Sequence, residues 1–159
     1  MGTWYGYASF GTESIQGKGK CVTARYSYNT SLQHVDVYNW QIPSPGYRSS
    51  INGSAVPMNP DLRQGHLKVT FVISDNATKT FPLHILDTDY DRWAVVYFCR
   101  DLLHHHETSG WILTRDQNLD KMKDRKVILR KVEKVLKNAR LETSKYTKTV
   151  QQNCAASTQ

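Results

Sequence analysis

The sequence predicts a mainly β protein that forms one domain, either an antiparallel barrel or a sandwich, followed by one helix. Eight short segments rich in Val, Ile, Thr, Tyr and Trp come first, and turn-forming residues separate them at intervals of about ten residues. The hydrophobic periodicity then changes to that of a helix. A chain of 159 residues is long enough to bury one substantial core, so we expect a single domain over residues 1–159.

The β segments occupy residues 3–115. We expect strands near residues 3–10, 20–28, 34–42, 49–57, 66–74, 79–87, 92–100 and 108–115. Turn-forming residues lie between them, at 16–19, 28–31, 43–46, 61–65 and 74–77. Because successive side chains of a strand point to opposite faces, the residues that face the interior can be proposed from alternation along each strand.

Residues 119–140 have the spacing of an amphipathic helix. Its apolar stripe consists of Met122, Ile128, Leu129, Val132, Val135, Leu136 and Ala139. Positive charges cover the other face, because residues 121–140 hold nine Lys or Arg and two acids, a surplus equal to the formal net charge of +7 of the whole chain. An extended piece at 145–150 follows, within a C-terminal tail of residues 145–159 that contains Cys154.

Other sequence features concern the compartment. No run of about 18 apolar residues is present, so no transmembrane helix is expected. Three Asn-x-Ser/Thr triplets, at Asn29, Asn52 and Asn76, fall in polar stretches where we expect turns, and they favour a secreted glycoprotein. The three cysteines include no C-x-x-C pair, so neither a redox motif nor a zinc ribbon is expected, and one thiol is left over.

No catalytic arrangement stands out. The sequence lacks Ser-His-Asp spacing, a Gly-rich phosphate loop and a paired-carboxylate motif, so no catalytic residue is assigned and an enzyme is not expected. His104, His105 and His106 raise the question of a metal site. Neighbouring residues cannot easily direct three imidazoles at one ion, and no fourth ligand lies at a suitable spacing. We therefore expect no metal, and a polar hairpin between two strands is the simplest interpretation.

Three short motifs occur in order along the strand pattern. They are Gly2-x-Trp4 in the first strand, Thr88-Asp89-Tyr90 between the sixth and seventh strands, and Arg115 at the end of the eighth. This order resembles the signature regions of the lipocalins, and the resemblance covers nearly the whole chain. The stretches GKCVTARYSY, ILDTDYDRWAVVYFC, SGWILTRDQNL and KYTKTVQQNC are similar to the branch that includes apolipoprotein D and the arthropod pigment carriers: bilin-binding proteins, insecticyanins and crustacyanins. The resemblance implies an eight-stranded up-and-down barrel with one C-terminal helix packed outside and a short ninth strand.

Trp4, Arg115 and Asp89 have a structural interpretation. A large indole on the first strand can fill the closed end of a barrel, and a guanidinium laid across it gains cation–π energy of ~0.5–2 kcal/mol. Asp89, in a tight turn at the same end, could accept backbone N–H bonds. These signature residues are expected to hold the fold together rather than to contact a ligand.

The resemblance also implies how the cysteines pair. In the apolipoprotein D-like branch, one disulfide joins the start of the second strand to a cysteine near the C-terminus, which corresponds to Cys21 and Cys154. A second joins the seventh strand to a cysteine ahead of the first strand. Cys99 occupies the first of these places, and we expect its partner to lie ahead of Met1.

Alternation along the strands and the same resemblance indicate which residues line a ligand pocket. They are Asn39, Gln41, Leu83, Val96, Phe98 and Trp111. Buried amides need partners, so Asn39 and Gln41 are expected to meet a ligand, a water or another side chain. Similar bilin carriers place a histidine five or six residues before the Trp that matches Trp111, which selects His105 or His106 here. Either imidazole could bond a propionate or a pyrrole.

The expected function is that of a secreted carrier for one small hydrophobic molecule, with a bilin such as biliverdin as the first hypothesis. A fatty acid, a carotenoid or a steroid-like lipid are alternatives, and so is salivary-type capture of biogenic amines or lipid mediators. Axial haem ligation is not expected, because Ser27 stands where some haem-carrying relatives have a histidine.

The basic helix at 121–140 suggests a further partner. Its lysines and arginines could recruit a heparin-like polyanion or an anionic membrane surface, although a solvated face on a packed helix is the simpler interpretation. Nucleic-acid binding is not expected, because this face has no interleaved aromatic residues.

Overall fold

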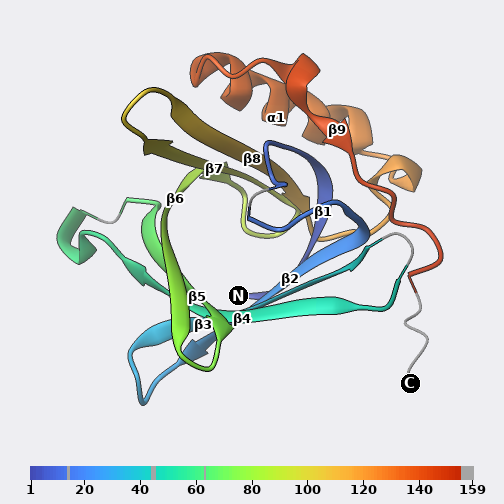
Figure 1. Ribbon diagram of the computed structural model, residues 1–159. Helices are drawn as coiled ribbons and strands as arrows, with labels where there is room; N and C mark the ends of the chain where they lie inside the picture. Colours follow the sequence, from blue (N-terminus) through green and yellow to red (C-terminus); the bar gives the residue numbers. More distant parts are fainter. Residues whose placement is uncertain (14, 44–45, 63, 155–159) are drawn as a thin grey trace.

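The computed structural model describes residues 1–13, 15–43, 46–62 and 64–154 and confirms an eight-stranded antiparallel barrel (Figure 1). The strands are β1 (Gly2–Phe10), β2 (Gly19–Asn29), β3 (His34–Pro43), β4 (Ser49–Pro57), β5 (His66–Ser74), β6 (Ala77–Thr88), β7 (Trp93–Asp101) and β8 (His106–Thr114). Short 3-10 turns lie at Pro60–Leu62, Leu119–Lys121 and Thr143–Lys145. In the part of the chain that the structure describes, no helix has the length and apolar character needed to cross a bilayer.

The barrel closes through β1, which has neighbours on both sides. Its first half pairs with β2, from Gly2 opposite Tyr26 to Tyr5 opposite Thr23. Its second half pairs with β8, so the ring β2-β3-β4-β5-β6-β7-β8-β1 is continuous. Beyond the contact with β2, the short strand β9 (Thr147–Lys148) takes the remaining edge of β1. The predicted ninth strand is therefore confirmed, although it is shorter than the extended piece expected at 145–150.

The single α-helix, α1 (Arg125–Asn138), packs outside the barrel but is shorter than the predicted 119–140. Leu119 is buried in a separate 3-10 turn, and Met122 has extended backbone between that turn and α1. Met122 and Ala139 are exposed, so the predicted apolar stripe is wrong at both ends. Met122 lies seven residues before Leu129, which is the spacing expected for one face of a helix. This spacing does not show that the chain leaves the helix between Leu119, which is buried in its own turn, and Arg125.

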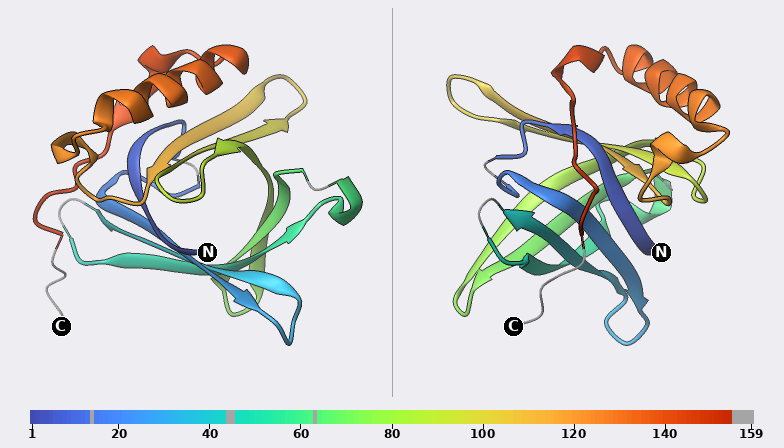
Figure 2. Two further views of the ribbon diagram at one scale, coloured as in Figure 1. Left: turned by 180° about the vertical axis from the view of Figure 1, so that it is seen from behind. Right: turned by 90° about the vertical axis from the view of Figure 1, so that its right-hand side faces the viewer.

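Hydrophobic clusters on both sides of the barrel wall, two inside and one outside, explain why β7 is apolar along most of its length. Ala94, Val96 and Phe98 point inward, where Phe98 makes an edge-to-face contact with Phe81 of β6 at a ring-centroid distance of 5.6 Å. Trp93 and Val95 point outward and pack against α1 through Ile128, Val132 and Leu136. Figure 2 shows α1 lying along this side of the barrel.

The closed end of the barrel is built from the signature residues. The Arg115 guanidinium lies 3.8 Å from the Trp4 ring centre, and its Nη1 donates to the Thr3 carbonyl at 2.9 Å. Asp89 Oδ1 accepts hydrogen bonds from the backbone N–H groups of Arg92 (2.8 Å) and Trp93 (3.0 Å). Burial disfavours ionisation of Asp89, but these bonds and the Arg92 charge outweigh it and lower its pKa. Both expected structural roles are confirmed.

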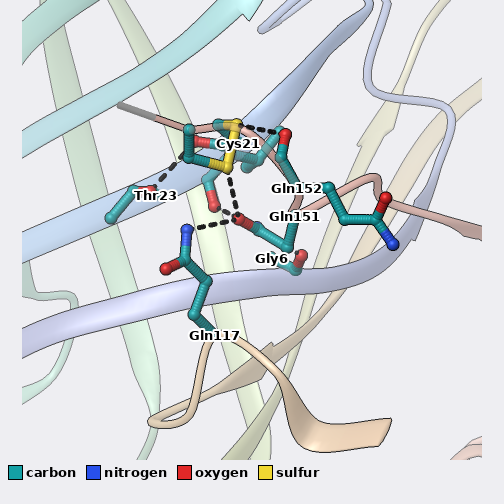
Figure 3. Close-up of a disulfide and its surroundings, with 8 residues drawn as sticks. Gly6, Cys21, Thr23, Gln117, Gln151 and Gln152 are labelled. Carbon is teal, nitrogen blue, oxygen red and sulfur yellow. Dashed lines mark hydrogen bonds between the residues drawn. A yellow bond between two sulfur atoms is a disulfide. The ribbon is translucent and has the colours of Figure 1, made fainter. Parts of the chain in front are cut away.

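The disulfide between Cys21 and Cys154 is also confirmed, and it joins residues 133 positions apart (Figure 3). Beside it, the Gln151 amide donates to the carbonyls of Gly6 (2.9 Å) and Val22 (2.8 Å) and so bridges β1 and β2. Closing so long a loop is expected to stabilise the fold by roughly 2–5 kcal/mol. Cys99 is a free thiol on the outward face of β7.

The glycosylation triplets do not all lie at turns. Asn76 is exposed between β5 and β6, and Asn29 ends β2, where its Oδ1 accepts a bond from Leu32 N at 3.1 Å. Asn52 is exposed but lies within β4, so its expected position in a turn is wrong. The turns expected at 43–46 and 61–65 and the tail to residue 159 lie partly outside the described residues, which omit 44, 45, 63 and 155–159.

Candidate functional site

The open end of the barrel lies opposite Trp4. Because the strands alternate in direction, the connections β1–β2, β3–β4, β5–β6 and β7–β8 all lie at this end. The β1–β2 connection turns over the opening, where Ile15 packs against the inward-facing cluster of Val37, Phe71 and Phe98. Figure 1 shows this connection crossing the top of the ring. The mouth is thus partly covered by the protein's own chain.

Gln16, on the same connection, joins two of the predicted pocket residues. Trp111 Nε1 on β8 donates to Gln16 Oε1 at 3.2 Å. Gln41 Nε2 on β3 donates to the Gln16 carbonyl, and Gln16 Nε2 lies 3.5 Å from Gln41 Oε1. Gln41 is buried, so its amide is satisfied by this loop. Gln16 was missed in the sequence, because alternation along strands says nothing about a residue in a connection.

Asn39 lies deeper on the same strand, on the inward face. Val37 on one side of it is buried in the inner cluster, and Gln41 follows on the other. The Asn39 Oδ1 atom is buried and has no hydrogen-bond partner. A buried carbonyl without a donor is unfavourable, so this atom is a ready acceptor for a group inside the barrel.

The surroundings of Asn39 are apolar and aromatic. Val96 and Phe98 are buried and Leu83 is half-buried, all three on the inward face as predicted. Tyr26 also packs between the two inner clusters, and burial raises the pKa of its phenol to about 12. The phenol therefore stays protonated at neutral pH. Leu83, Tyr26 and Trp111 point inward and yet are only half-buried, so protein atoms do not fully cover their inner surfaces.

An ion pair, Arg100 with Glu107, stands on the inner face near the mouth. Arg100 has the same alternation on β7 as Val96 and Phe98, and it pairs across the ladder with Glu107 of β8. Its Nη2 donates to Glu107, whereas its buried Nε has no partner. Sequence reasoning missed Arg100, although continuing the alternation of β7 by one step would have found it.

The predicted histidines lie away from this group. His105 is in the turn between β7 and β8, and His106 begins β8; both are exposed. His106 Nδ1 lies 2.6 Å from Asp101 Oδ1 across the hairpin. No cluster of three or more His, Cys, Asp or Glu side chains suited to a metal ion occurs among the described residues. The structure brings Asn39, Gln41, Leu83, Val96, Phe98 and Trp111 to the interior but leaves the two histidines at the rim.

A hollow of about 910 Å³ opens beside the mouth, between the β1–β2 connection, the end of β3 and the C-terminal segment. Gln16 and Gln41 border it, but Leu83, Val96 and Phe98 do not, so it is distinct from the barrel interior. The charged residues that line this hollow are Glu13, Lys18, Lys20, Arg48, Lys145 and Lys148.

Comparison with known proteins agrees with the geometry. The chain is 34% identical over 155 residues to the Lazarillo protein of Schistocerca americana, covering 95% of this chain and 67% of that protein. It is 33% identical to the crustacyanin-A1 subunit of Homarus gammarus, covering 99% and 81%. Its structure is similar to insecticyanin from the tobacco hornworm Manduca sexta, with a TM-score of 0.80, 25% identity, and coverage of 98% of this chain and 80% of that one.

The family itself follows from the sequence match. Residues 1–153 match the lipocalin / cytosolic fatty-acid binding protein family, which is nearly all of the chain. The barrel, the Trp4–Arg115 stack and the apolar interior with a few polar groups are what a carrier of small hydrophobic molecules requires. The chain therefore belongs to the lipocalin family and is a ligand-binding carrier of small hydrophobic molecules.

Proposed function

We propose that this lipocalin carries a bilin, such as biliverdin, inside its barrel. The observation that carries the proposal is a pair of unsatisfied groups on the inner wall. Asn39 Oδ1 is an acceptor without a donor, and Arg100 Nε is a donor without an acceptor. In the strand order, β3 and β7 lie on opposite sides of the ring, so one ligand that meets both must span the interior.

The chemistry of these two groups separates the candidate ligands. A bilin has pyrrole N–H groups for Asn39 and propionate carboxylates for Arg100, on a long conjugated body that suits aromatic walls. A fatty acid supplies only the carboxylate, a steroid alcohol only a hydroxyl, and a carotenoid hydrocarbon chain neither. A biogenic amine supplies a donor but no negatively charged acceptor for Arg100. The bilin answers both groups with several N–H donors and two carboxylates, and a lipid mediator that has both a carboxylate and hydroxyl groups is the competing class.

The test is a titration of the protein with biliverdin, followed by visible absorption and circular dichroism. We expect a saturable, red-shifted band. Asn39→Leu should weaken binding by roughly 3- to 10-fold, the value of one neutral hydrogen bond. The double variant Arg100→Gln/Glu107→Gln, which leaves no unpaired glutamate, should weaken it by about 10- to 100-fold, because a charged bond is lost.

Arg48→Gln is the matched control, because Arg48 lies outside the barrel, stacked 4.4 Å from the Trp40 ring centre. It should leave the titration unchanged. Absence of any saturable change, in protein whose Cys21–Cys154 disulfide is intact, would rule out the bilin. Mass spectrometry of co-purifying molecules would then identify the lipid or amine that is carried.

The histidines have a separate test in the same titration. His105 and His106 are exposed at the rim, where either could reach a propionate that emerges from the mouth. If they do, His105→Ala or His106→Ala shifts the bound band as well as the affinity. An unchanged spectrum in both variants assigns them to a solvated hairpin.

The carrier is proposed to work outside the cell. A long-range disulfide is typical of oxidising compartments, and Asn52 and Asn76 are exposed within acceptor triplets. Expression of the chain behind a secretion signal in insect cells should give a product that shifts in electrophoretic mobility on treatment with an N-glycosidase. An unmodified product would remove the glycosylation argument.

A further inference from the structure

The outward face of α1 carries a row of positive charges. Lys126, Arg130 and Lys134 are four residues apart and exposed, so they lie one above another on one side of the helix. Lys137 continues the row and Lys131 lies beside it, also exposed. The row extends about 16 Å from Lys126 to Lys137 at the rise of an α-helix. Ile128, Val132 and Leu136 on the opposite side of α1 pack against the barrel, so this row faces solvent.

Two of the acidic residues near this row are paired with other cations, and the third, Glu133, is exposed on α1 within three or four residues of Arg130 and Lys137. Asp124 accepts a bond from Arg92 at 2.5 Å, and Asp120 pairs with Arg125 at 3.0 Å and with Lys148. Among the described residues, no ion pair reaches Lys126, Arg130, Lys131, Lys134 or Lys137. Like charges four residues apart destabilise a helix, and the single carboxylate of Glu133 offsets only part of the repulsion among these five cations. A partner that supplies the missing negative charge would offset it.

The contrast with the hollow beside the mouth supports this choice. That hollow is also basic, but Lys18, Lys145 and Lys148 each have a carboxylate partner. Arg48 there is stacked on Trp40 and Tyr38. The five cations of α1 are a concentrated group with one carboxylate, Glu133, on the same helix, and none of the five is in an ion pair among the described residues.

The buried face of α1 decides what kind of partner fits. Ile128, Val132 and Leu136 pack against the barrel, so the apolar face that an amphipathic helix inserts into a bilayer is already occupied. The outward face has no aromatic residue on which a base could stack. A flexible, hydrophilic chain with regularly spaced negative charges can follow the row without either feature. We propose that the outward face of α1 is a docking site for a sulfated polysaccharide, independent of the ligand in the barrel.

Heparin is the probe for this site. Binding is measured by salt elution from a heparin column and by titration calorimetry at several NaCl concentrations. The variant Lys126→Gln/Arg130→Gln/Lys134→Gln should elute at clearly lower salt. The slope of log K against log salt should fall by about two to three, because three counter-ion-releasing contacts are lost.

The control variant is Lys18→Gln/Arg25→Gln/Lys68→Gln, which removes the same kinds and number of charges from exposed positions on the barrel. It should elute close to the wild type. An equal loss in both variants would overturn the site, because net charge alone would then explain retention. Circular dichroism and melting temperature show that both variants remain folded.

Two competing partners are separated in the same series. Vesicles of phosphatidylserine and a short DNA duplex are titrated at the same ionic strength. Weaker binding to both than to heparin supports the polysaccharide. Stronger binding to either, lost in the α1 variant, overturns it in favour of a membrane surface or a nucleic acid.

Discussion

His84 is a side chain whose ionisation links stability to pH near neutrality. It lies on the outward face of β6, directly opposite His66 of β5, with 4.6 Å between ring centroids. Burial lowers the pKa of His84 below its ordinary value of 6.5, and the charge of His66 lowers it further. The unfolded chain therefore takes up a proton at a pH where the folded protein still resists it.

The free energy of unfolding should fall as pH drops below about 6.5, and the loss should be complete below the lowered folded pKa. Above pH 6.5 both states are neutral at this position, and the residue contributes nothing to the slope. Urea denaturation at pH 7.5 and 5.5 measures the change. His84→Gln should reduce the loss, whereas His104→Gln, in the exposed hairpin, should not. The prediction fails if His84→Gln and the wild type lose stability equally.

The inner wall shows how far residue-level prediction reaches. Asn39, Leu83, Val96, Phe98 and Trp111 follow from alternation and family resemblance, because a strand fixes the direction of each side chain. Gln16 could not be found this way, since its position depends on how a connection folds over the mouth. The unsatisfied atoms are also invisible in the sequence, because a hydrogen bond is a property of the packed structure.

At the level of elements, the strands were easier to predict than the helix. Each strand is bounded by turn residues and has few alternative registers once one face is buried. The boundaries of α1 depend on packing, since Leu119 anchors a separate turn while Met122 stays exposed. Helical spacing of apolar residues is necessary for a helix but does not mark its first turn.

Two substitutions test this boundary. Ile128→Ala should destabilise the protein by about 2–5 kcal/mol, because Ile128 is buried between α1 and the barrel. Met122→Ala should change stability by less than about 0.5 kcal/mol, since Met122 is exposed ahead of α1. Thermal or urea unfolding of the two variants gives the comparison. Similar losses in both would mean that the apolar stripe does include Met122.

The whole molecule is predictable where several signals agree. Strand count, the three motifs and the cysteine positions all point to one closed barrel, and the Cys21–Cys154 disulfide and the Trp4–Arg115 stack confirm it. The identity of the ligand is a different matter, because it depends on where polar groups stand on the inner wall after folding. Arg100 shows this, since alternation along β7 can place its side chain inside but cannot show that its Nε is left without a partner.

The β1–β2 connection over the mouth is expected to control how fast the ligand enters and leaves the barrel. We expect a ligand that passes through the mouth to require movement of Ile15 and Gln16, which breaks the bonds from Trp111 and Gln41. Gln16→Ala keeps the backbone carbonyl that Gln41 Nε2 contacts but removes the side-chain contacts with Trp111 Nε1 and Gln41 Oε1. At about 0.5–1.5 kcal/mol each, their loss should speed release of the proposed bilin roughly tenfold. Stopped-flow displacement measures it, with Glu13→Gln on the same connection as the control. Equal release rates in the wild type and Gln16→Ala would show that the ligand leaves by another route. Slower release from the wild type would mean that opening of the β1–β2 connection, a movement of the protein itself, sets how long the ligand stays bound.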